Sequence, residues 1–247
     1  MTDKRANLLK SFSRRRAAWP GCRGAMGLVA VLCLSVAGVA TAGGQAPVTA
    51  RQAGAWPESS DANQLIEWIR VSGDNQGLPF AIIDKKAALL HVFDSAGARR
   101  GASPVLLGKA LGDDSVPGIG ERSMASIQPH ERTTPAGRFV SEPGRNLHGE
   151  DIVWISYDVA VSLHRVRASN QAERRLQRLA TPDASDNRIS YGCVNVPTAF
   201  YDRLVKPTLG AAPGVIYVLP ETRPVSAMFG LTERPGREDN ARSASAR

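Results

Sequence analysis

The chain has 247 residues, with 31 lysines and arginines against 23 aspartates and glutamates, and a formal net charge of +8. Seven of the basic residues and one of the acidic residues precede position 43, which leaves 24 against 22 for the remaining chain. This near balance excludes a nucleic-acid-binding protein, because the excess positive charge belongs to the first 42 residues. The remaining residues, about two hundred, predict one domain around one sizeable core.

The first 42 residues have the pattern of an export signal. Basic residues up to Arg23 are followed by an uncharged run from Ala25 to Ala42, which ends in the small-residue site Ala40-Thr41-Ala42. That order is typical of a signal peptide that is cleaved on export. We therefore expect residues 1–42 to be removed and the mature protein to have no stable insertion in a membrane. The alternative is a retained anchor, because the apolar run is only slightly shorter than a bilayer requires.

Residues 43–77 are predicted to be a polar linker that ends in a short helix. Ser60 or Asp61 is a suitable N-cap for this helix. Three apolar side chains then fall on one helix face: Leu65, Trp68 and Ile69. Two β-like runs follow, at residues 80–84 and 88–94, and together they predict a β-hairpin.

The middle of the chain alternates strands with turns rich in glycine and proline. Residues 104–107 predict a third strand, and residues 111–120 predict a loop. The sequence Thr134-Pro135-Ala136-Gly137-Arg138-Phe139 predicts a turn that leads into a strand, because proline and glycine suit the special backbone positions of a tight turn. Residues 152–166 are β-like for most of their length.

Two helices are predicted after residue 170. Residues 171–179 favour a helix by composition, with Leu176 and Leu179 as its buried pair. Asn195 is a suitable N-cap for a second helix that continues through Val205.

The C-terminal part predicts one more strand and then a tail. Residues 214–219 are apolar and predict a last buried strand. Residues 221–247 are rich in charged and small residues and predict a solvated tail, so the compact domain is expected to span residues 78–220. Strands dominate the pattern, and a mainly β domain with a few short helices is the expected fold.

Cys193 is the only cysteine beyond position 42, which excludes an internal disulfide in the mature protein. It is therefore either a reactive thiol or an inert buried side chain. The predicted helix start at Asn195 would place backbone N–H groups near the sulfur and favour the thiolate. Gly192 would permit a close approach of backbone to substrate, and amides near Gly192 and Cys193 would hold a developing oxyanion.

A thiol of ordinary pKa is only slightly ionised at neutral pH, so a reactive Cys193 would require a neighbouring base. In the run 152–166, Val161 and Leu163 share one strand face, while Ser162 and His164 share the other. His164 therefore points away from the apolar face and is the preferred base. The other three histidines are weaker candidates, two in predicted loops and one on a predicted solvated strand face: His130, His148 and His91. The spacing of these residues predicts no metal site.

The sequence Ser190-Tyr191-Gly192-Cys193-Val194-Asn195, preceded by His164, resembles the motif of L,D-transpeptidase catalytic domains of the YkuD type. The turn at residues 134–139 and the closing strand at 214–220 also resemble this family, and the resemblance covers about residues 78–220. Two features depart from it. Tyr191 stands where the family usually has histidine, and 25 residues (165–189) separate His164 from Ser190, which is longer than usual. The polar stretch around Glu173 can absorb this length as a lid over the cleft.

The resemblance implies a β-sandwich-like catalytic domain and a periplasmic enzyme that acts on peptidoglycan stem peptides without a cofactor. Cys193 would form a thioester with the stem peptide, and His164 would serve as base and then as acid. Ser190 would hold His164 in orientation, and Gly192 would lie beside the oxyanion. Substrate contacts are expected from three further residues: Tyr191, Asn195 and Arg188. The acceptor amine stays open.

Two other functions are compatible with the same residues. Water instead of an amine would resolve the thioester in a carboxypeptidase or an amidase. A non-catalytic cell-wall-binding protein on the same scaffold is the second alternative, and the departure at Tyr191 motivates it. In that protein Cys193 would be no more than a small buried side chain.

Overall fold

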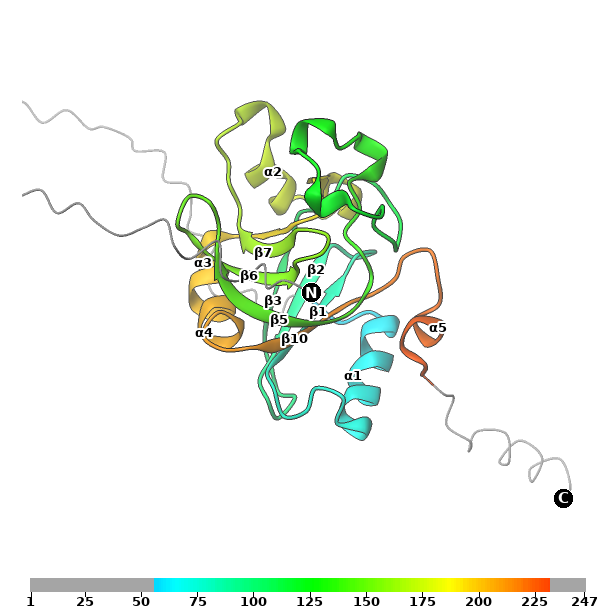
Figure 1. The fold of residues 1–247 in the computed structure, drawn as a ribbon. Helices are drawn as coiled ribbons and strands as arrows, with labels where there is room; N and C mark the ends of the chain where they lie inside the picture. Colours follow the sequence, from blue (N-terminus) through cyan, green and yellow to red (C-terminus); the bar gives the residue numbers. More distant parts are fainter. Residues whose placement is uncertain (1–55, 232–247) are drawn as a thin grey trace, which may run out of the picture. The chain divides into compact units, whose positions relative to one another are not determined.

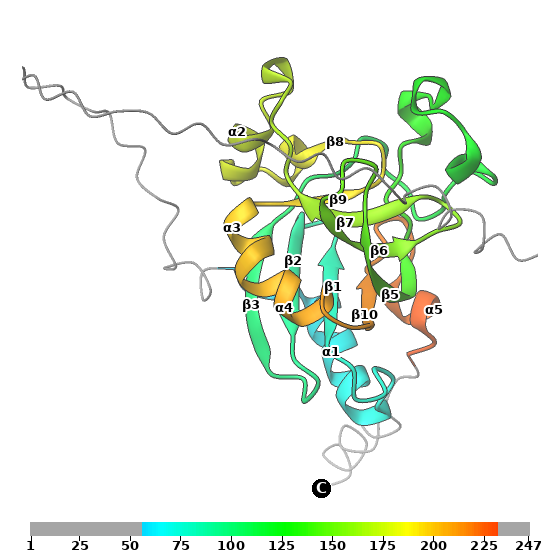
Figure 2. The ribbon, with the colours of Figure 1, turned by 60° about the vertical axis from the view of Figure 1, so that its left-hand side comes forward.

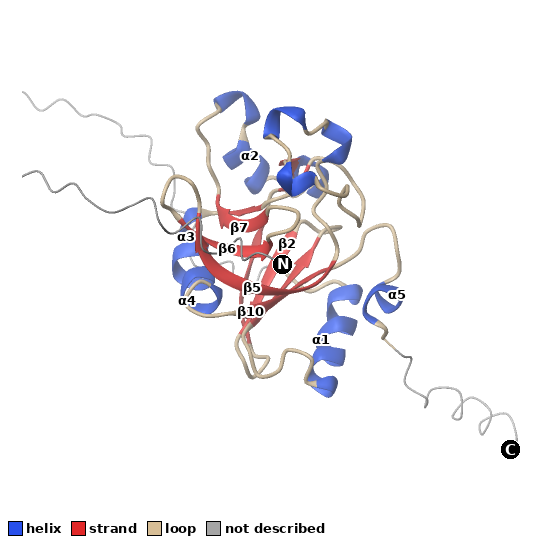
Figure 3. Cartoon of the chain, in the orientation of Figure 1, coloured by secondary structure: helices blue, strands red, loops and turns tan. Residues whose placement is uncertain are grey.

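The computed structural model describes residues 56–231, which form a mainly β domain with short helices around it (Figures 1 and 3). An eight-stranded mixed sheet has the order β3-β2-β1-β10-β5-β6-β7-β9, and β4 pairs with β8 beside it. The strands are β1 (Phe80–Asp84), β2 (Leu89–Phe93), β3 (Arg99–Pro104), β4 (Leu107–Gly108), β5 (Gly137–Arg145), β6 (Asp151–Ser156), β7 (Val161–Arg165), β8 (Arg188–Ser190), β9 (Val194–Val196) and β10 (Gly214–Val218). The α-helices are α1 (Ser60–Ser72), α2 (Arg175–Ala180), α3 (Thr198–Phe200), α4 (Lys206–Leu209) and α5 (Val225–Phe229). None of the helices between residues 56 and 231 has the length and apolar character to cross a membrane.

The long strand β5 lets the large sheet bend back on itself (Figure 2). Its residues 137–141 pair with β10, and its residues 142–145 pair with β6. Side chains from β1, β2 and β10 thereby meet side chains from β6, β7 and β9 in one apolar core. A bridge between Leu106 and Asn195 joins the segment after β3 to β9 and closes the far side of the sheet. The predicted mainly β, sandwich-like fold is confirmed.

Two predicted strands differ from the structure, and β8 and β9 were not predicted as strands. The hairpin is confirmed as β1 and β2, and the last strand as β10. The third strand spans Arg99–Pro104 instead of the predicted residues 104–107, because the chain turns tightly between Asp94 and Ala98 and then pairs with β2 at once. The run 152–166 forms two strands instead of one, β6 and β7, around a tight turn in which Ala160 has a φ of 52°.

Strands β1, β2 and β10 have a second face, opposite this core. That face is covered by α1 and by the chain after β10. α1 begins after the N-cap Ser59, and it buries four side chains: Ala62, Leu65, Ile66 and Ile69. Val225 of α5 and Leu231 belong to the same apolar cluster. The prediction of a solvated tail from Glu221 is therefore wrong as far as Leu231, because these apolar side chains have a sheet face on which to pack. Residues 232–247 and the predicted leader 1–42 lie outside the described residues.

The predicted helix 171–179 is interrupted. A short 3-10 turn over Gln171–Glu173 ends at Arg174, whose φ is 51°, and α2 starts after it. Leu179 is buried as predicted, but Leu176 is 60% exposed. Both leucines belong to α2, and this short helix buries only the side that carries Leu179.

Asn195 does not cap a helix, in contrast to the prediction. It lies in β9, which pairs in parallel with β7, and its backbone exchanges two hydrogen bonds with Leu106. Pairing with these distant segments keeps the chain extended as far as Val196, and α3 begins only at Thr198. The free amides of a helix N-terminus therefore do not lie directly after Cys193.

His91 is buried, although a solvated strand face was predicted for it. It lies in β2 between Ile82 of β1 and Ala102 of β3, and its side is the one that α1 covers. Neither ring nitrogen has a hydrogen-bond partner among the described residues. Burial, and then the positive charge of Arg99, lower the pKa of His91 below its ordinary value of 6.5. His91 therefore stays neutral in the folded protein at pH values where it is protonated in the unfolded chain.

This burial predicts a stability that depends on pH. Because the pKa is lower in the folded state, stability should be complete above pH 6.5 and should be lost as the pH falls below that value. Exchange of His91→Leu should flatten this loss and stabilise the protein at neutral pH by about 1 kcal/mol, since an unpaired buried polar group is removed. Urea unfolding between pH 5 and 8 would measure both effects. A matched His148→Ala variant, changed at an exposed loop, should keep the wild-type pH profile; an unchanged slope in His91→Leu would contradict the prediction.

Candidate active site

Cys193 lies between β8 and β9. In the part of the sheet formed by β6, β7 and β9, it is on the face opposite the apolar core. It is half-buried and has no disulfide partner. Its Sγ is 3.7 Å from the hydroxyl of Ser162 in β7 and 3.7 Å from the carbonyl oxygen of Ala160, to which the thiol donates. Ser162 was predicted on this strand face, but a role in the site was not predicted for it. The strand alternation was the signal that could have indicated one.

His164 is brought to the same place by the parallel pairing of β7 and β9. Its Nδ1 is 2.8 Å from the carbonyl oxygen of Arg165. A carbonyl oxygen only accepts hydrogen bonds, so Nδ1 carries the proton of the neutral ring and Nε2 keeps the free electron pair. This is the tautomer that a general base for a neighbouring thiol requires.

The ionisation of Cys193 depends on two of these neighbours. Burial by itself raises the pKa of the thiol. A hydrogen bond from His164, the positive charge that its ring gains when it takes the thiol proton, and hydrogen bonds from Ser162 outweigh that effect and lower the pKa below its ordinary value of 9.0. The thiolate is thus favoured by His164 and Ser162, and not by a helix N-terminus as the sequence had suggested.

Asn195 connects His164 to the segment between β7 and β8. Its Nδ2 is 3.4 Å from His164 Nε2 and donates to the carbonyl oxygen of Cys193 at 3.2 Å. Its Oδ1 accepts a hydrogen bond of 2.6 Å from Arg175 at the start of α2. A guanidinium can only donate, so Arg175 determines which end of the amide faces His164. Asn195 is only 1% exposed, so it lies beneath His164 and Cys193 and is not available to a substrate. This corrects the prediction that Asn195 contacts the substrate.

Arg175 was not predicted as a site residue, although it belongs to the long polar stretch between His164 and Ser190. Exchange of Arg175→Ala leaves the buried Asn195 Oδ1 without this donor, and should lower the free energy of unfolding by about 1–2 kcal/mol. It should also slow acylation of Cys193 about tenfold, because the Asn195 amide can then rotate away from His164. Urea unfolding and the time course of acylation measure these effects. The matched control is Arg203→Ala, at an exposed arginine whose side chain donates to the carbonyl of Ala199. If both variants behave alike, Arg175 does not position Asn195 for the reaction.

Ser190 and Gly192 form the turn that precedes the thiol. Ser190 Oγ donates to the carbonyl oxygen of Cys193 at 2.6 Å and accepts from the Gly192 N–H at 3.1 Å. Ser190 therefore holds this turn and does not orient His164, whose ring is held by Arg165 instead. The Gly192 N–H is already engaged, which leaves the Cys193 N–H as the candidate oxyanion donor of this pair.

Gly192 is required by the packing of the backbone. Its φ is 130°, and a Cβ at this position would lie 2.8 Å from the carbonyl oxygen of Thr133. The next residue, Thr134, donates from Oγ1 to the Gly192 carbonyl at 2.8 Å and accepts from the Gly108 N–H at 2.9 Å. Gly192 was expected to allow a substrate to approach the backbone closely. In the structure, the group that approaches Gly192 closely is the turn before β5.

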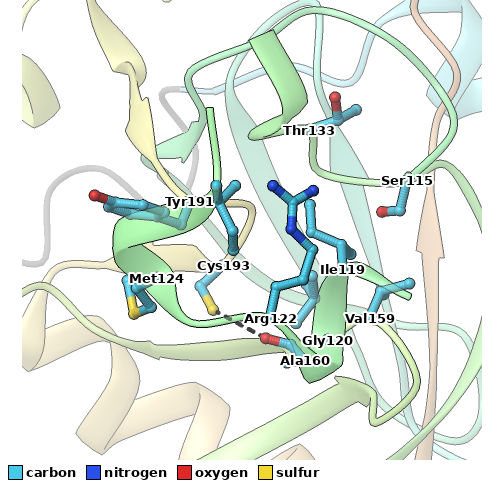
Figure 4. A pocket seen from close by; sticks show the side chains of 12 residues that line it. Ser115, Ile119, Gly120, Arg122, Met124, Thr133, Val159, Ala160, Tyr191 and Cys193 are labelled. Carbon is cyan, nitrogen blue, oxygen red and sulfur yellow. Dashed lines mark hydrogen bonds between the residues drawn. The ribbon is translucent and has the colours of Figure 1, made fainter. Parts of the chain in front are cut away.

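A pocket of about 110 Å³ opens beside Cys193 (Figure 4). Its walls are the capping segment (residues 115–133), the turn between β6 and β7, and Tyr191. The apolar part of the lining includes Ile119, Met124, Ile127 and Val159. Figure 4 shows Cys193 at this pocket, with its thiol directed at the Ala160 carbonyl. The pocket can hold an uncharged part of a substrate next to the sulfur.

Tyr191 lies against the capping segment. The guanidinium of Arg132 lies 3.7 Å from the centre of the Tyr191 ring and also donates to the carbonyl oxygen of Ile127. Within the segment, Arg122 donates to both carboxylate oxygens of Glu131, at 2.8 and 3.0 Å, and lowers the pKa of Glu131 to about 2. The ring of Tyr191 therefore supports the wall of the pocket through a cation–π contact. A hydroxyl contact from Tyr191 to substrate stays a prediction.

Arg188 does not lie in the pocket. Its guanidinium pairs with Glu221 and donates to the carbonyl oxygen of Lys85 at 2.8 Å. Lys85 is itself fully buried, with Nζ 2.8 Å from Asp113 and 3.5 Å from Glu221. Arg188 is thus occupied by an internal ion network that anchors the chain after β10, and the structure gives no support to its expected contact with a substrate carboxylate.

The remaining histidines are away from the site. His130 and His148 are exposed, the latter in the loop between β5 and β6. Across residues 56–231, no three histidine, cysteine, aspartate or glutamate side chains are grouped as a metal site would need.

No family model and no curated protein matches the chain. Among solved structures, it is similar to the catalytic domain of the E. faecium L,D-transpeptidase, with 18% identity over 57% of this chain and 96% of that one, and a TM-score of 0.31. It is similar to an L,D-transpeptidase from Xylanimonas cellulosilytica, with 14% identity, 57% and 60% coverage and a TM-score of 0.36. It is also similar to the helical cell shape determining protein Pgp2 from Campylobacter jejuni, with 11% identity, 70% and 62% coverage and a TM-score of 0.38. The chain spans less than two thirds of the last two proteins.

Proposed function

We propose that this chain is an exported cysteine acyltransferase that acts on peptidoglycan stem peptides by L,D-transpeptidation. The observation that carries the proposal is the pairing of Cys193 with His164. The imidazole lowers the pKa of the thiol, and its Nδ1 proton is held by the Arg165 carbonyl, so that Nε2 carries the electron pair that can accept a proton. The adjoining pocket supplies a place for the acyl donor.

The proposed reaction uses these groups in two steps. His164 takes the thiol proton, and Cys193 Sγ attacks the carbonyl of the bond between a diamino acid and D-alanine. The C–N bond breaks, D-alanine leaves with the proton from His164, and a thioester remains. An acceptor amine then attacks the thioester and passes its proton to His164, and the thiol leaves and is reprotonated. The Cys193 N–H is placed to stabilise the oxyanion of both steps.

We further propose that the protein acts in the periplasm after removal of residues 1–42, and that Tyr191 contacts the bound donor from the pocket wall. The Tyr191 ring lines the pocket next to Cys193, which supports the second point.

Intact-protein mass spectrometry of the full chain, mixed with a defined tetrapeptide stem, tests the proposed function. We expect an adduct of the mass of the stem without its terminal D-alanine, and proteolysis should locate it on the peptide that contains Cys193. Cross-linked stems in the same tube would establish transfer, whereas trimmed stems alone would establish hydrolysis. Folded protein that forms no adduct with several donors, and whose thiol alkylates no faster than a simple thiol, would contradict an enzymatic role.

A further inference from the structure

The hydroxyl of Thr134 connects the turn before β5 to the peptide group that precedes the thiol. Thr134 is fully buried, and its Oγ1 lies 2.8 Å from the Gly192 carbonyl oxygen and 2.9 Å from the Gly108 nitrogen. The Gly108 N–H can only donate, so the hydroxyl accepts from it. The single proton of the hydroxyl is therefore directed at the Gly192 carbonyl.

This carbonyl belongs to the same peptide group as the Cys193 N–H. A peptide group is planar and trans, so its C=O and its N–H point in opposite directions. A hydrogen bond that fixes the carbonyl toward Thr134 therefore also fixes the direction of the N–H, away from Thr134. The N–H and Sγ belong to one residue, so an oxygen on the carbon that the sulfur attacks comes within reach of this N–H.

The turn that carries Thr134 is packed tightly between two glycines. An ideal Cβ on Gly108 would lie 2.7 Å from the Thr134 nitrogen, and one on Gly192 would lie 2.8 Å from the Thr133 carbonyl oxygen. The branched Cβ of threonine also restricts χ1 of the side chain. A hydroxyl held in this way can orient a peptide group without rearrangement during a reaction.

The backbone of Thr134 is held by the buried ion network. Lys85 Nζ donates to the Thr134 carbonyl oxygen at 3.1 Å and to Asp113 at 2.8 Å, and both charged side chains are fully buried. Asp113 also accepts from the backbone N–H groups of Glu221 and Thr222, at 2.7 and 2.9 Å. Removal of one partner from such a network leaves a buried charge unpaired, which keeps the network intact in the folded protein. The network that anchors the chain after β10 thus also anchors the turn before β5.

We propose that Thr134 is a positioning residue that directs the Cys193 N–H at the oxyanion, with Lys85 holding Thr134 in place. The inference rests on the part of the proposed function in which Cys193 attacks a carbonyl group. It predicts that loss of the Thr134 hydroxyl slows reactions that pass through an oxyanion and leaves other reactions of the thiol unchanged. Ionisation of the thiol depends on His164 and Ser162 instead.

Two reactions of the same thiol, measured on the full chain, separate these effects. p-Nitrophenyl acetate acylates the sulfur: an S–C bond forms, the ester C–O bond breaks, and p-nitrophenolate leaves from a tetrahedral oxyanion. Iodoacetamide alkylates the sulfur by displacement of iodide from a saturated carbon, and no oxyanion forms. Mass spectrometry after proteolysis follows both products on the peptide that contains Cys193, separately from Cys22 and Cys33.

Thr134→Val replaces the hydroxyl by a methyl group of similar size. It should slow acylation about tenfold to a hundredfold, while the alkylation rate stays within about twofold of wild type and its midpoint against pH is unchanged. Thr134→Ser keeps the hydroxyl and should acylate within about threefold of wild type. The matched control is Ser103→Ala, which removes another buried hydroxyl that donates to a carbonyl, in β3, and should keep both wild-type rates. Thr134→Ala provides the same comparison if the valine variant does not fold.

An NMR measurement is independent of both reactions. In protein labelled with ¹⁵N-cysteine, the Cys193 amide resonance, identified by its loss in Cys193→Ala, should shift in Thr134→Val and keep its position in Thr134→Ser, because the hydrogen bond to the Gly192 carbonyl polarises this peptide group. If stem peptides form no adduct but Thr134→Val slows acylation by the ester alone, the proposed function fails and the inference stands. Equal losses of acylation and alkylation in Thr134→Val, or no loss of acylation, would overturn the inference.

Discussion

Exchange of Cys193→Ala is expected to abolish adduct formation with stem peptides, a loss on the order of 10⁴-fold or more in the acylation rate. The physical reason is that alanine has no group that can form the thioester. Exchange of Cys193→Ser should also lose nearly all acylation, because a hydroxyl is far less ionised than a thiol whose pKa has been lowered. The time course of intact-protein mass measures both variants under the conditions used for the wild type.

This loss should occur without a loss of folding. The contacts of the thiol with Ser162 and with the Ala160 carbonyl are long, each at 3.7 Å, and contribute little to the stability of the fold. The melting temperature of Cys193→Ala should therefore stay within about 2 °C of wild type, which distinguishes a missing nucleophile from an unfolded protein. A stem-sized adduct on the alanine variant would show that another residue is the nucleophile.

Exchange of His164→Ala is expected to slow acylation by about 10²- to 10⁴-fold, the usual contribution of a positioned general base. His164 lowers the pKa of the Cys193 thiol by hydrogen bonding and by charge, against the effect of burial. Its removal should raise that pKa, so that a smaller share of the thiol is ionised at neutral pH. The midpoint of the alkylation rate against pH should accordingly move upward.

Iodoacetamide alkylation between pH 5 and 10 measures this midpoint without any peptide substrate. The matched control is His148→Ala, which removes an exposed histidine in the loop between β5 and β6. It should keep both the wild-type midpoint and the wild-type acylation rate. A midpoint in His164→Ala that equals that of the wild type would mean that another group sets the ionisation of Cys193.

Local patterns in the sequence were sufficient for much of the sheet. The hairpin β1–β2, the turn before β5 and the strand β10 follow from short runs of apolar residues bounded by glycine, proline or polar turns. The same alternation placed His164 and Ser162 on the face opposite Val161 and Leu163. Strand periodicity is a local property, so these features could be predicted without knowledge of the neighbours.

The supporting parts of the site depend on neighbours that are distant in the sequence. Ser190 bonds the backbone of its own turn, whereas the ring of His164 is held by the Arg165 carbonyl. Asn195 was assigned to a helix cap because its local context suits one, but pairing with β7 and Leu106 places it in a strand beneath His164. Arg175 reaches this amide across 20 residues of sequence. No local pattern contains that contact.

The sequence by itself determined the candidate nucleophile, its base and the mainly β character of the domain, because these depend on one cysteine and on period-two patterns. Only the tertiary structure decided which charges are free. Glu221 belongs by composition to a tail, yet it is 6% exposed and pairs with Arg188, which removes that arginine from the predicted substrate contacts. Burial and pairing between distant segments determine whether a charge is available to a substrate, and both arise only when the sheet closes around β5.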